Sequence, residues 1–576
     1  MVAWSKTIMV SAAVIAASLS SGEAATAESK RRLGVSSFIS GLVAPFTGGI
    51  DNLKESAVEG IKDLGVDFLS WYFGDTDLVI DPNDPRFDDT IFTTDNYYGE
   101  QLDFLLAGLK SDNGQAMQDW YLQGTGASEI RSGLVRNGPG PNTKMFLSYN
   151  GVKAALEEYG DRIEADTLER KNELGIQILN GNLWPETPGG VKTIGLGQTK
   201  ENHAFVRPLL AKALDKGTGS SCDGSTCWND AWLTSKAKAF FNGKTEFHTS
   251  DIKWFTTQIL HKLHLNMDLN EADARRFADY MSKMIILIPL SDSMLNDSIL
   301  ESVLSIKDTK DKKAGYLTAC KNAIYQKYAS EDFVKNNDVE KIELLASVYL
   351  DSLQFAGGLS VPTVLSYMLA LTQMSDSNKH ASLKGQRLSL NNFEWIMWET
   401  LRKYAPVAGV PSWIPSNGND WQHVIPNVAA ALTDADVFEN PMQFKNRGIA
   451  KYHQTMMKNG DVPNAGIGWA GPAIHKNSNG EFDTAAPHSH NCPAQDLSFR
   501  LMKAFVKEFV NAGPWSAVDA DDISVTAYSA SGFKLLKTGM SYNTSYSYKP
   551  SCKEGYSWVS TRWKWWGQRS WTCKVL

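Results

Sequence analysis

The sequence predicts a mainly α-helical fold with small β-sheets, and two observations lead to this class. From about residue 250 to 405, apolar residues recur at spacings near 3.6, the period of a helix with one face in a core. The strand-like sequence that we identify, Ile523 to Leu536, is short by comparison. The expected helices are Asp251 to His264, Glu271 to Ile288, Ile299 to Ser305, Ala314 to Ala329, Val339 to Met374, Leu390 to Tyr404 and Leu497 to Val510.

Composition places the chain among ordinary globular proteins. It has 576 residues, of which 43% are hydrophobic and 21% charged, so it is long enough for a large core. The formal net charge is -7, and no basic stripe dominates the sequence. Since the overall field mildly repels phosphate, we expect no nucleic-acid partner.

The N-terminus has the pattern of a secretory signal over residues 1–27. Lys6 supplies a positive charge, Thr7 to Leu19 is a short apolar run, and Ala25-Thr26-Ala27 offers a small-x-small cleavage site. We therefore expect the protein in the secretory pathway or secreted. An uncleaved anchor and a plastid address reached through such a signal are the alternatives.

Six cysteines fit an oxidising compartment, where most should pair. The pair Cys222–Cys227 brackets a tight loop, and the pair Cys552–Cys573 brackets the Trp-rich tail, so both could form disulfides. Cys320 and Cys492 remain. They could pair with each other, and that disulfide is the alternative to any chemical role of Cys492.

Cys492 follows a turn-prone stretch of Gly, Pro, Asn and His and precedes the amphipathic helix expected over Leu497 to Val510. A cysteine at the start of a helix lies at the positive end of the helix dipole, which favours the thiolate. A thiolate held there could ligate a haem iron.

A charge pattern lies upstream of this cysteine. Glu399 and Arg402 are three residues apart on the helix expected over Leu390 to Tyr404, so they share one face and can pair. The segment Phe438 to Arg447 follows and ends in a further arginine, Arg447. Taken alone, the Glu-x-x-Arg pattern equally describes an exposed ion pair of little energetic weight.

The order of these motifs resembles the haem-thiolate cytochromes P-450. That family has Glu-x-x-Arg, then an aromatic-Asn/Asp-Pro-x-x-Phe-x-x-Arg segment, then a cysteine loop that opens a helix. The resemblance covers roughly residues 250 to 535. It implies a cytochrome P-450-like fold and haem b as cofactor, with Cys492 as iron ligand and His490 against a haem propionate. It further implies that Glu399, Arg402 and Arg447 form a buried charge cluster that braces the cysteine loop.

Two positions of the cysteine loop depart from the family pattern. The usual Phe seven residues before the cysteine is Ala485, and the usual Gly two residues after it is Ala494. These departures affect the loop geometry that the resemblance implies, while the ligand itself is retained.

By the same resemblance, the helix expected over Val339 to Met374 crosses the distal haem face. It contains Gly357, Gly358 and Pro362, which are costly inside a helix. Such a cost suggests that a ligand approaches closely there, and a simple packing kink is the alternative.

The residues beside these glycines indicate the reaction class. Monooxygenases of the family carry an acid–alcohol pair for proton delivery, whereas here the two positions hold Leu359 and Ser360. The segment is similar to the branch of allene oxide synthases, hydroperoxide lyases and epoxyalcohol synthases, in which an Asn precedes Gly-Gly by three residues. Gln354 takes that position here, with the same amide on a longer side chain.

This branch implies an enzyme that rearranges or cleaves polyunsaturated fatty acid hydroperoxides. Such a substrate carries its own oxidant, so the expected partners are a small lipid and no reductase, which suits a secretory address. The alternatives are a conventional monooxygenase, a peroxygenase, or a secreted non-enzymatic lipid- or glycan-binding protein. We assign residues 28–536 to the haem-thiolate catalytic domain and 537–576 to a Trp-rich, disulfide-stapled tail.

Three further features carry weaker interpretations. The tail holds five Trp among Lys and Arg and could contact a glycan or a membrane surface peripherally, although a structural cap fits it better. His261 with His264, and His488 with His490, are spaced for a metal pair, but an ordinary helix face and the haem interpretation account for them better. Asn296 and Asn543 lie in glycosylation sequons.

Overall fold

The computed structural model describes residues 107–108, 114–138, 143–161, 200–214, 216–217, 222–278, 306–351, 358–406, 409, 412–415, 421–456, 467–468, 492–527, 530–538, 556–562 and 569–575. This part of the chain is mainly helical with three small sheets, as the sequence predicts. Its helices are α6 (Gln115–Leu122), α7 (Tyr149–Asp161), α9 (Lys200–Ala213), α10 (Asp230–Phe241), α11 (Asp251–Leu265), α15 (Ile306–Lys327), α16 (Asp332–Lys335), α17 (Val339–Asp351), α18 (Gly358–Gln373), α19 (Phe393–Lys403), α20 (Val428–Ala431), α21 (Ile449–Thr455) and α22 (Gln495–Ala512). Two 3-10 turns, Ala381–Leu383 and Ala520–Asp522, complete them.

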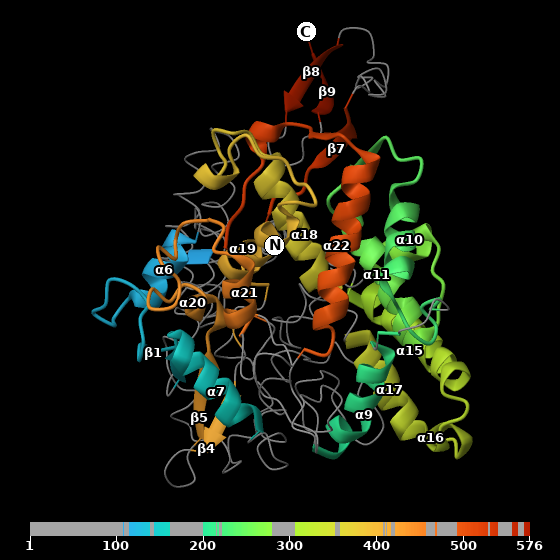
Figure 1. Cartoon of the computed structure of the whole chain (residues 1–576). Helices are drawn as coiled ribbons and strands as arrows, with labels where there is room; N and C mark the ends of the chain where they lie inside the picture. Colours follow the sequence, from blue (N-terminus) through green and yellow to red (C-terminus); the bar gives the residue numbers. More distant parts are fainter. Residues whose placement is uncertain are drawn as a thin grey trace, which may run out of the picture.

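The main core lies between α10, α11, α18, α19 and α22 (Figure 1). Helix α22 packs along α10 and also contacts α18 and α19. It does so through one apolar face, which includes the buried side chains of Leu501, Phe505 and Phe509. Its other face is polar, so burial of this single stripe fixes how the helix lies.

A second core joins α9, α11, α15 and α17 on one side of the molecule (Figure 1). Helix α17 supplies several of its fully buried residues, such as Leu345 and Tyr349. Helix α11 contributes to both cores and is buried on nearly every face. Its polar residues are therefore enclosed as well, which matters for His261 and His264.

The sheets are small and peripheral. One has the order β1 (Val135–Asn137), β2 (Thr143–Phe146), β5 (Trp421–Pro426), β4 (Ser412–Pro415), and its β2–β5 pair is parallel. The second has the order β3 (Glu246–His248), β7 (Lys534–Lys537), β6 (Trp515–Ala517). The third is the antiparallel hairpin β8 (Tyr556–Arg562) and β9 (Arg569–Val575), which Figure 1 places beside the C-terminus.

The expected helices agree with the structure where it describes them, except that α15, predicted over Ala314 to Ala329, begins eight residues earlier at Ile306. Helices α11 and α22 match their predicted ranges within two residues at each end, and α19 begins three residues later than predicted. The helix expected over Val339 to Met374 is described as α17 and α18, and residues 352–357 between them lie outside the described residues. The helix expected from Glu271 is described to Ala278, and Ile299 to Ser305 lies outside.

The strand expected over Ile523 to Leu536 is largely wrong. Only its end forms a strand, β7, with an isolated bridge between Val525 and Ala530 before it. The tail of the chain is the β8–β9 hairpin, and Cys552, the partner expected for Cys573, lies outside the described residues. The Cys222–Cys227 disulfide forms as predicted.

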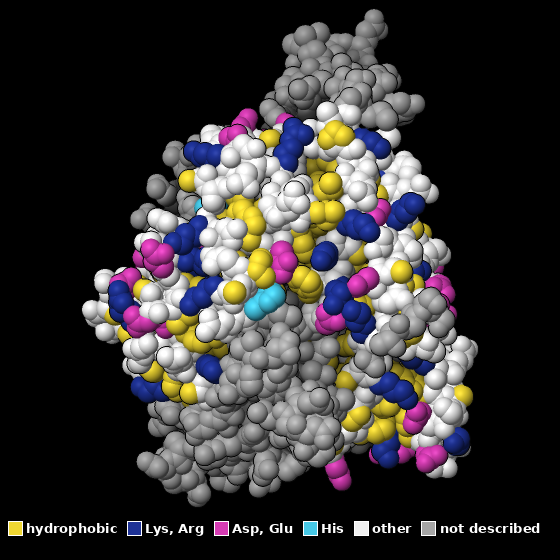
Figure 2. Space-filling model, viewed as in Figure 1, with side chains coloured by type: hydrophobic (Ala, Val, Ile, Leu, Met, Phe, Trp, Pro, Cys, Tyr) yellow, Lys and Arg dark blue, Asp and Glu magenta, His cyan; other side chains and the backbone are white. Residues whose placement is uncertain are grey.

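Charges on the described surface are mixed. Figure 2 shows Lys and Arg side chains interspersed with Asp and Glu over the described part of one face. No single-sign field is gathered there that would favour nucleic acid. Among the described helices, none is both long enough and apolar enough to cross a membrane.

Candidate functional site

The candidate site begins with α19, a helix that is buried on all sides. From Trp395 to Lys403, every residue of α19 is buried. Two of its charged residues, Glu399 and Arg402, have 0% exposed side chains, so they depend on protein partners for their polar contacts.

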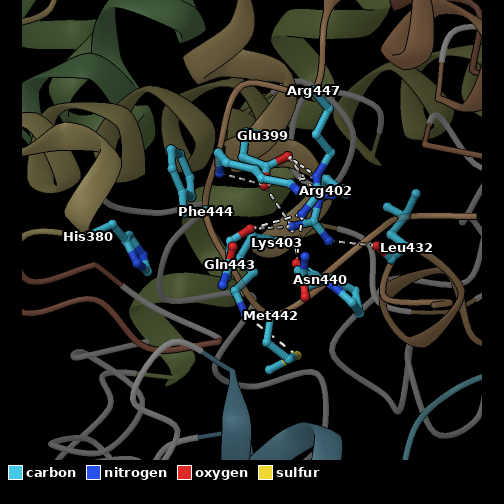
Figure 3. Close-up of polar contacts among 12 residues, drawn as sticks. His380, Glu399, Arg402, Lys403, Leu432, Asn440, Met442, Gln443, Phe444 and Arg447 are labelled. Atoms are coloured by element: carbon cyan, nitrogen blue, oxygen red, sulfur yellow. Dashed lines mark hydrogen bonds and ion pairs between the residues drawn. The ribbon is translucent and has the colours of Figure 1, made fainter.

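Arg402 finds a complete set of acceptors. Its Nε donates to Glu399 Oε2 at 2.9 Å and its Nη2 to Glu399 Oε1 at 2.7 Å, a two-pronged ion pair. Its Nη1 donates to the carbonyl of Leu432 at 2.8 Å, and Nη2 also reaches the carbonyl of Pro441 at 2.8 Å. The guanidinium thus ties α19 to the segments after α20 (Figure 3).

Arg447 joins the same carboxylate from a segment far away in sequence. Its Nε donates to Glu399 Oε2 at 3.2 Å, and its Nη2 donates to the carbonyls of Gln443 and Asn440 at 2.9 Å and 3.1 Å. Burial, followed by the charge of Arg402, lowers the pKa of Arg447 from its usual range. One carboxylate is therefore placed between two guanidinium groups.

Two further groups complete the shell of Glu399. The Tyr452 hydroxyl donates to Oε2 at 3.1 Å, and the Lys445 backbone N–H donates to Oε1 at 3.1 Å. Burial, with the charge of Glu399 second, raises the pKa of Tyr452, so the phenol keeps the proton that it donates. The predicted set of Glu399, Arg402 and Arg447 is one contiguous cluster, and Tyr452 is a member that the sequence motif does not include.

Aromatic rings enclose the cluster. Phe438 is fully buried, with the guanidinium carbons of Arg402 and Arg447 at 5.4 Å and 5.9 Å from its ring centroid. His380 stacks on Phe444 with ring centroids 4.9 Å apart, and its Nε2 lies 3.0 Å from the Tyr404 hydroxyl. Burial, followed by the charge of Lys403, lowers the pKa of His380 to about 4. The sequence analysis missed His380, and its distance along the chain from Glu399 gives no signal to find it.

Cys492 lies just before α22, as the sequence predicts, and is half-buried. Cys320 is buried and forms no disulfide, so the Cys320–Cys492 bridge that would oppose a chemical role is not formed. Because α22 contacts both α18 and α19, the cysteine-bearing helix is joined to the helix that carries the charge cluster. Three residues after Cys492, the Nε2 atom of Gln495 is buried and has no hydrogen-bond partner among the described residues.

The remaining predicted site residues are only partly described. Gly358 is buried and Ser360 half-buried in α18, which contains Pro362 and packs on α11, α19 and α22. Gln354, Gly357 and His490 lie outside the described residues. The roles of these residues stay predictions.

The two histidine pairs that are spaced for a metal ion do not form a metal site among the described residues. His261 and His264 are both buried, and His261 Nδ1 is 2.9 Å from the Thr257 carbonyl. Within the described ranges, no group of three His, Cys, Asp or Glu side chains is placed to hold a metal ion. His488 lies outside those ranges.

No protein-family model matches the chain, and no curated protein matches it. Among solved structures it is similar to P-450 BioI in complex with an acyl carrier protein ligated to hexadec-9Z-enoic acid, at 14% identity and a TM-score of 0.47, over 73% of this chain and 97% of that one. It is similar to a myxobacterial cytochrome P-450 in complex with myristic acid, at 13% identity and a TM-score of 0.48, over 73% of this chain and 96% of that one. It is also similar to a cytochrome P-450 enzyme from Bacillus subtilis, at 14% identity and a TM-score of 0.43, over 73% of this chain and 98% of that one. These identities and TM-scores are too low to establish a family or a function.

Proposed function

We propose that the chain is a haem-thiolate enzyme of the cytochrome P-450 type, with haem b ligated by Cys492. The observation that carries this proposal is the buried cluster of Glu399, Arg402 and Arg447 on and beside α19, together with the cysteine at the start of the contacting helix α22. An exposed ion pair, the alternative for the Glu-x-x-Arg pattern, is ruled out by the 0% exposure of both side chains.

The surroundings of Cys492 suit an iron ligand. The side chain is half-buried, so it is screened from bulk water without being enclosed in the core. The start of α22 supplies the positive end of a helix dipole, which favours a thiolate. Three residues further on, the buried Nε2 of Gln495 has no partner within the described ranges, and it could donate a hydrogen bond to a thiolate or to a haem propionate.

The reaction that we propose is the rearrangement or cleavage of a polyunsaturated fatty acid hydroperoxide. When bound, thiolate-ligated haem favours cleavage of an O–O bond, because the thiolate increases electron density at the iron. Gln354 would donate a hydrogen bond to a peroxide oxygen, and Gly358 at the start of α18, with Gly357 before it in the sequence, would leave room for the substrate. Leu359 has no proton to deliver, which disfavours a conventional monooxygenase.

Absorption spectroscopy of the purified full chain tests the cofactor. We expect a Soret band, and a red-shifted band for the reduced protein with carbon monoxide, typical of thiolate ligation. Cys492→Ser should abolish that band, whereas the matched control Cys320→Ser should retain it. A chain purified from haem-supplemented cells that binds no haem would contradict the proposal and favour a non-enzymatic binding protein.

Turnover without reductant tests the reaction. The haem-loaded protein should consume a fatty acid hydroperoxide with no NADPH or reductase, and Gln354→Leu should change the product ratio or the rate while haem content stays unchanged. If hydroperoxides are left untouched and a substrate is hydroxylated only with NADPH and a reductase, the enzyme is a monooxygenase. Activity that requires hydrogen peroxide alone would indicate a peroxygenase.

We also propose that residues 1–27 direct the chain into the secretory pathway and are removed there. N-terminal sequencing of the protein secreted by a eukaryotic host should begin near residue 28. A chain that stays in the cytosol and keeps its first residues would contradict this proposal.

A further inference from the structure

Lys403 is the one charged residue of the buried part of α19 that the cluster leaves without an oxygen partner among the described residues. Its exposed fraction is 7%, close to that of Glu399 and Arg402 beside it. An ammonium group has three donors and no acceptor. The Nζ atom of Lys403 donates only to the Met442 thioether, 3.7 Å away (Figure 3), and a thioether sulfur is a weak acceptor.

The amine opens on a cavity. Lys403, Gln118, Tyr121, Thr433 and Met442 line a space with a volume of about 30 Å³. That is room for about two water molecules, so only a molecule of a few heavy atoms fits. The described residues of the proposed haem site, Cys492, Gly358 and Ser360, do not line it.

Gln118 offers a second donor at this cavity. The side chain is 5% exposed, and its Oε1 lies 2.8 Å from Thr433 Oγ1, whose single proton it shares with the Ala430 carbonyl at 2.7 Å. Its Nε2 has no partner among the described residues. The ammonium of Lys403 and the carboxamide of Gln118, both on buried residues, therefore line the cavity, and the Gln118 oxygen is already in contact with the Thr433 hydroxyl.

The charges around Lys403 favour an anion over water as the occupant. The charged groups that act on it are Glu399 and Arg402 from α19 and Arg447 from the following segment, so two guanidinium groups face one carboxylate, and its own charge acts in turn on His380. Burial, followed by the charge of Arg402, lowers the pKa of Lys403 to about 7. The other residues that line the cavity from α6 and α20 bring no carboxylate.

We propose that this cavity binds a small carboxylate-type anion, of the size of formate, acetate or bicarbonate, held by Lys403 Nζ and Gln118 Nε2. The anion supplies the acceptors that the two donors lack and balances the positive charge of the cluster. The planar CO₂ group presents two oxygens, so each donor can have one of them. This proposal does not rest on the haem assignment.

Titration of the full chain with ¹³C-formate at about pH 6, followed by ¹³C line broadening, tests the site directly. The wild type should broaden the signal saturably, and unlabelled acetate or bicarbonate should reverse the broadening, whereas chloride at equal ionic strength should not. Lys403→Met, which keeps the length of the side chain, should weaken formate binding about tenfold or more, since a charged hydrogen bond is lost. The exposed-lysine control Lys384→Met should bind as the wild type does.

A second variant keeps the test decisive if Lys403→Met does not fold. Gln118→Leu removes one donor, and Thr433 keeps the Ala430 carbonyl as an acceptor, so folding should be preserved while formate binding weakens. Wild-type binding should also be tighter at about pH 6 than at about pH 8, because the lysine must be protonated. Equal broadening by the wild type and both variants, or equal competition by chloride, would overturn the proposal, and the haem spectrum would be unaffected either way.

Discussion

Two buried polar regions of this molecule are built in opposite ways. At α19, the carboxylate of Glu399 receives donors from Arg402, Arg447, Tyr452 and the backbone of Lys445. In the second core, His264 on α11 is fully buried, and neither ring nitrogen has a hydrogen-bond partner in the part of the chain that the structure describes. The first region holds charge because each charged atom is partnered, and the second accommodates a polar ring only as long as it stays neutral.

The surroundings of His264 reinforce its neutrality. Its ring centroid lies 5.1 Å from that of Tyr349, and burial, with the charge of Lys327 second, lowers its pKa well below the usual value. Burial lowers the pKa of Lys327 itself to about 8, while its Nζ donates to the Leu263 carbonyl at the end of α11. A proton added to His264 would lie close to the positive charge of Lys327. No carboxylate is among the groups that lower or raise the pKa of His264.

The largest effect should follow from breaking the first region. Glu399→Gln leaves two buried guanidinium groups without a counter-charge, and loss of one partner of a buried ion pair costs about 3–5 kcal/mol. Chemical denaturation monitored by circular dichroism should therefore show a much lower free energy of unfolding. A loss below about 1 kcal/mol would mean that the cluster is not closed in solution.

Acid should act more strongly on the second region, which holds two such histidines, than on the first, where burial lowers the pKa of His380 alone to about 4. His261 has an ordinary pKa of 6.5 and a folded-state pKa of about 4, and that of His264 is also lowered. The unfolded chain therefore binds more protons between these values, so the free energy of unfolding is highest above about pH 6.5 and falls as the pH drops toward 4. At about 1.4 kcal/mol per pH unit, His261 alone accounts for a loss of about 3 kcal/mol.

Denaturation at several pH values between about 7 and 4 measures this dependence. The control is the double variant His261→Phe/His264→Phe, in which the decrease should be smaller by the contribution of both rings. An unchanged decrease in the double variant would show that other groups, such as His380 or the carboxylates, govern the acid response.

A gain in stability should follow from removing the unpartnered nitrogens of His264. His264→Phe keeps an aromatic ring against Tyr349 and eliminates two buried polar atoms, which are worth about 1–3 kcal/mol when unsatisfied. The free energy of unfolding at pH 7 should therefore increase or stay unchanged. A clear decrease would mean that a water or a further group hydrogen-bonds to the His264 ring in solution.

The sequence predicts one of these regions and not the other, for a physical reason. Glu399 and Arg402 are three residues apart on one helix, so their pairing follows from helical periodicity. Arg447 could be added only through the resemblance, because its contact spans 48 positions of the chain. Tyr452 and His380 join through the tertiary path of the chain, which no local period encodes.

The second region shows the same limit. The amphipathic spacing of α11 predicts the helix, but it does not predict that both cores enclose this helix. We therefore expected His261 and His264 on an ordinary helix face, whereas they are buried. Likewise, the periodicity that predicts α19 does not tell that Lys403 is buried on it without an oxygen partner among the described residues.

The smallest effect should come from an ion pair outside both regions. Arg275 donates to Glu271 at 2.8 Å and 2.9 Å, but their side chains are 43% and 48% exposed, and Arg275 also reaches Asp251 at 2.6 Å. Water replaces the lost partner in Glu271→Gln, and Asp251 remains, so the free energy of unfolding should change by no more than about 0.5 kcal/mol. The same denaturation measurement as for Glu399→Gln provides the comparison, and added salt should reduce even this difference. If Glu271→Gln cost as much as Glu399→Gln, then burial with complete partners would not be what distinguishes the α19 cluster, and charge pairing alone would explain both sites.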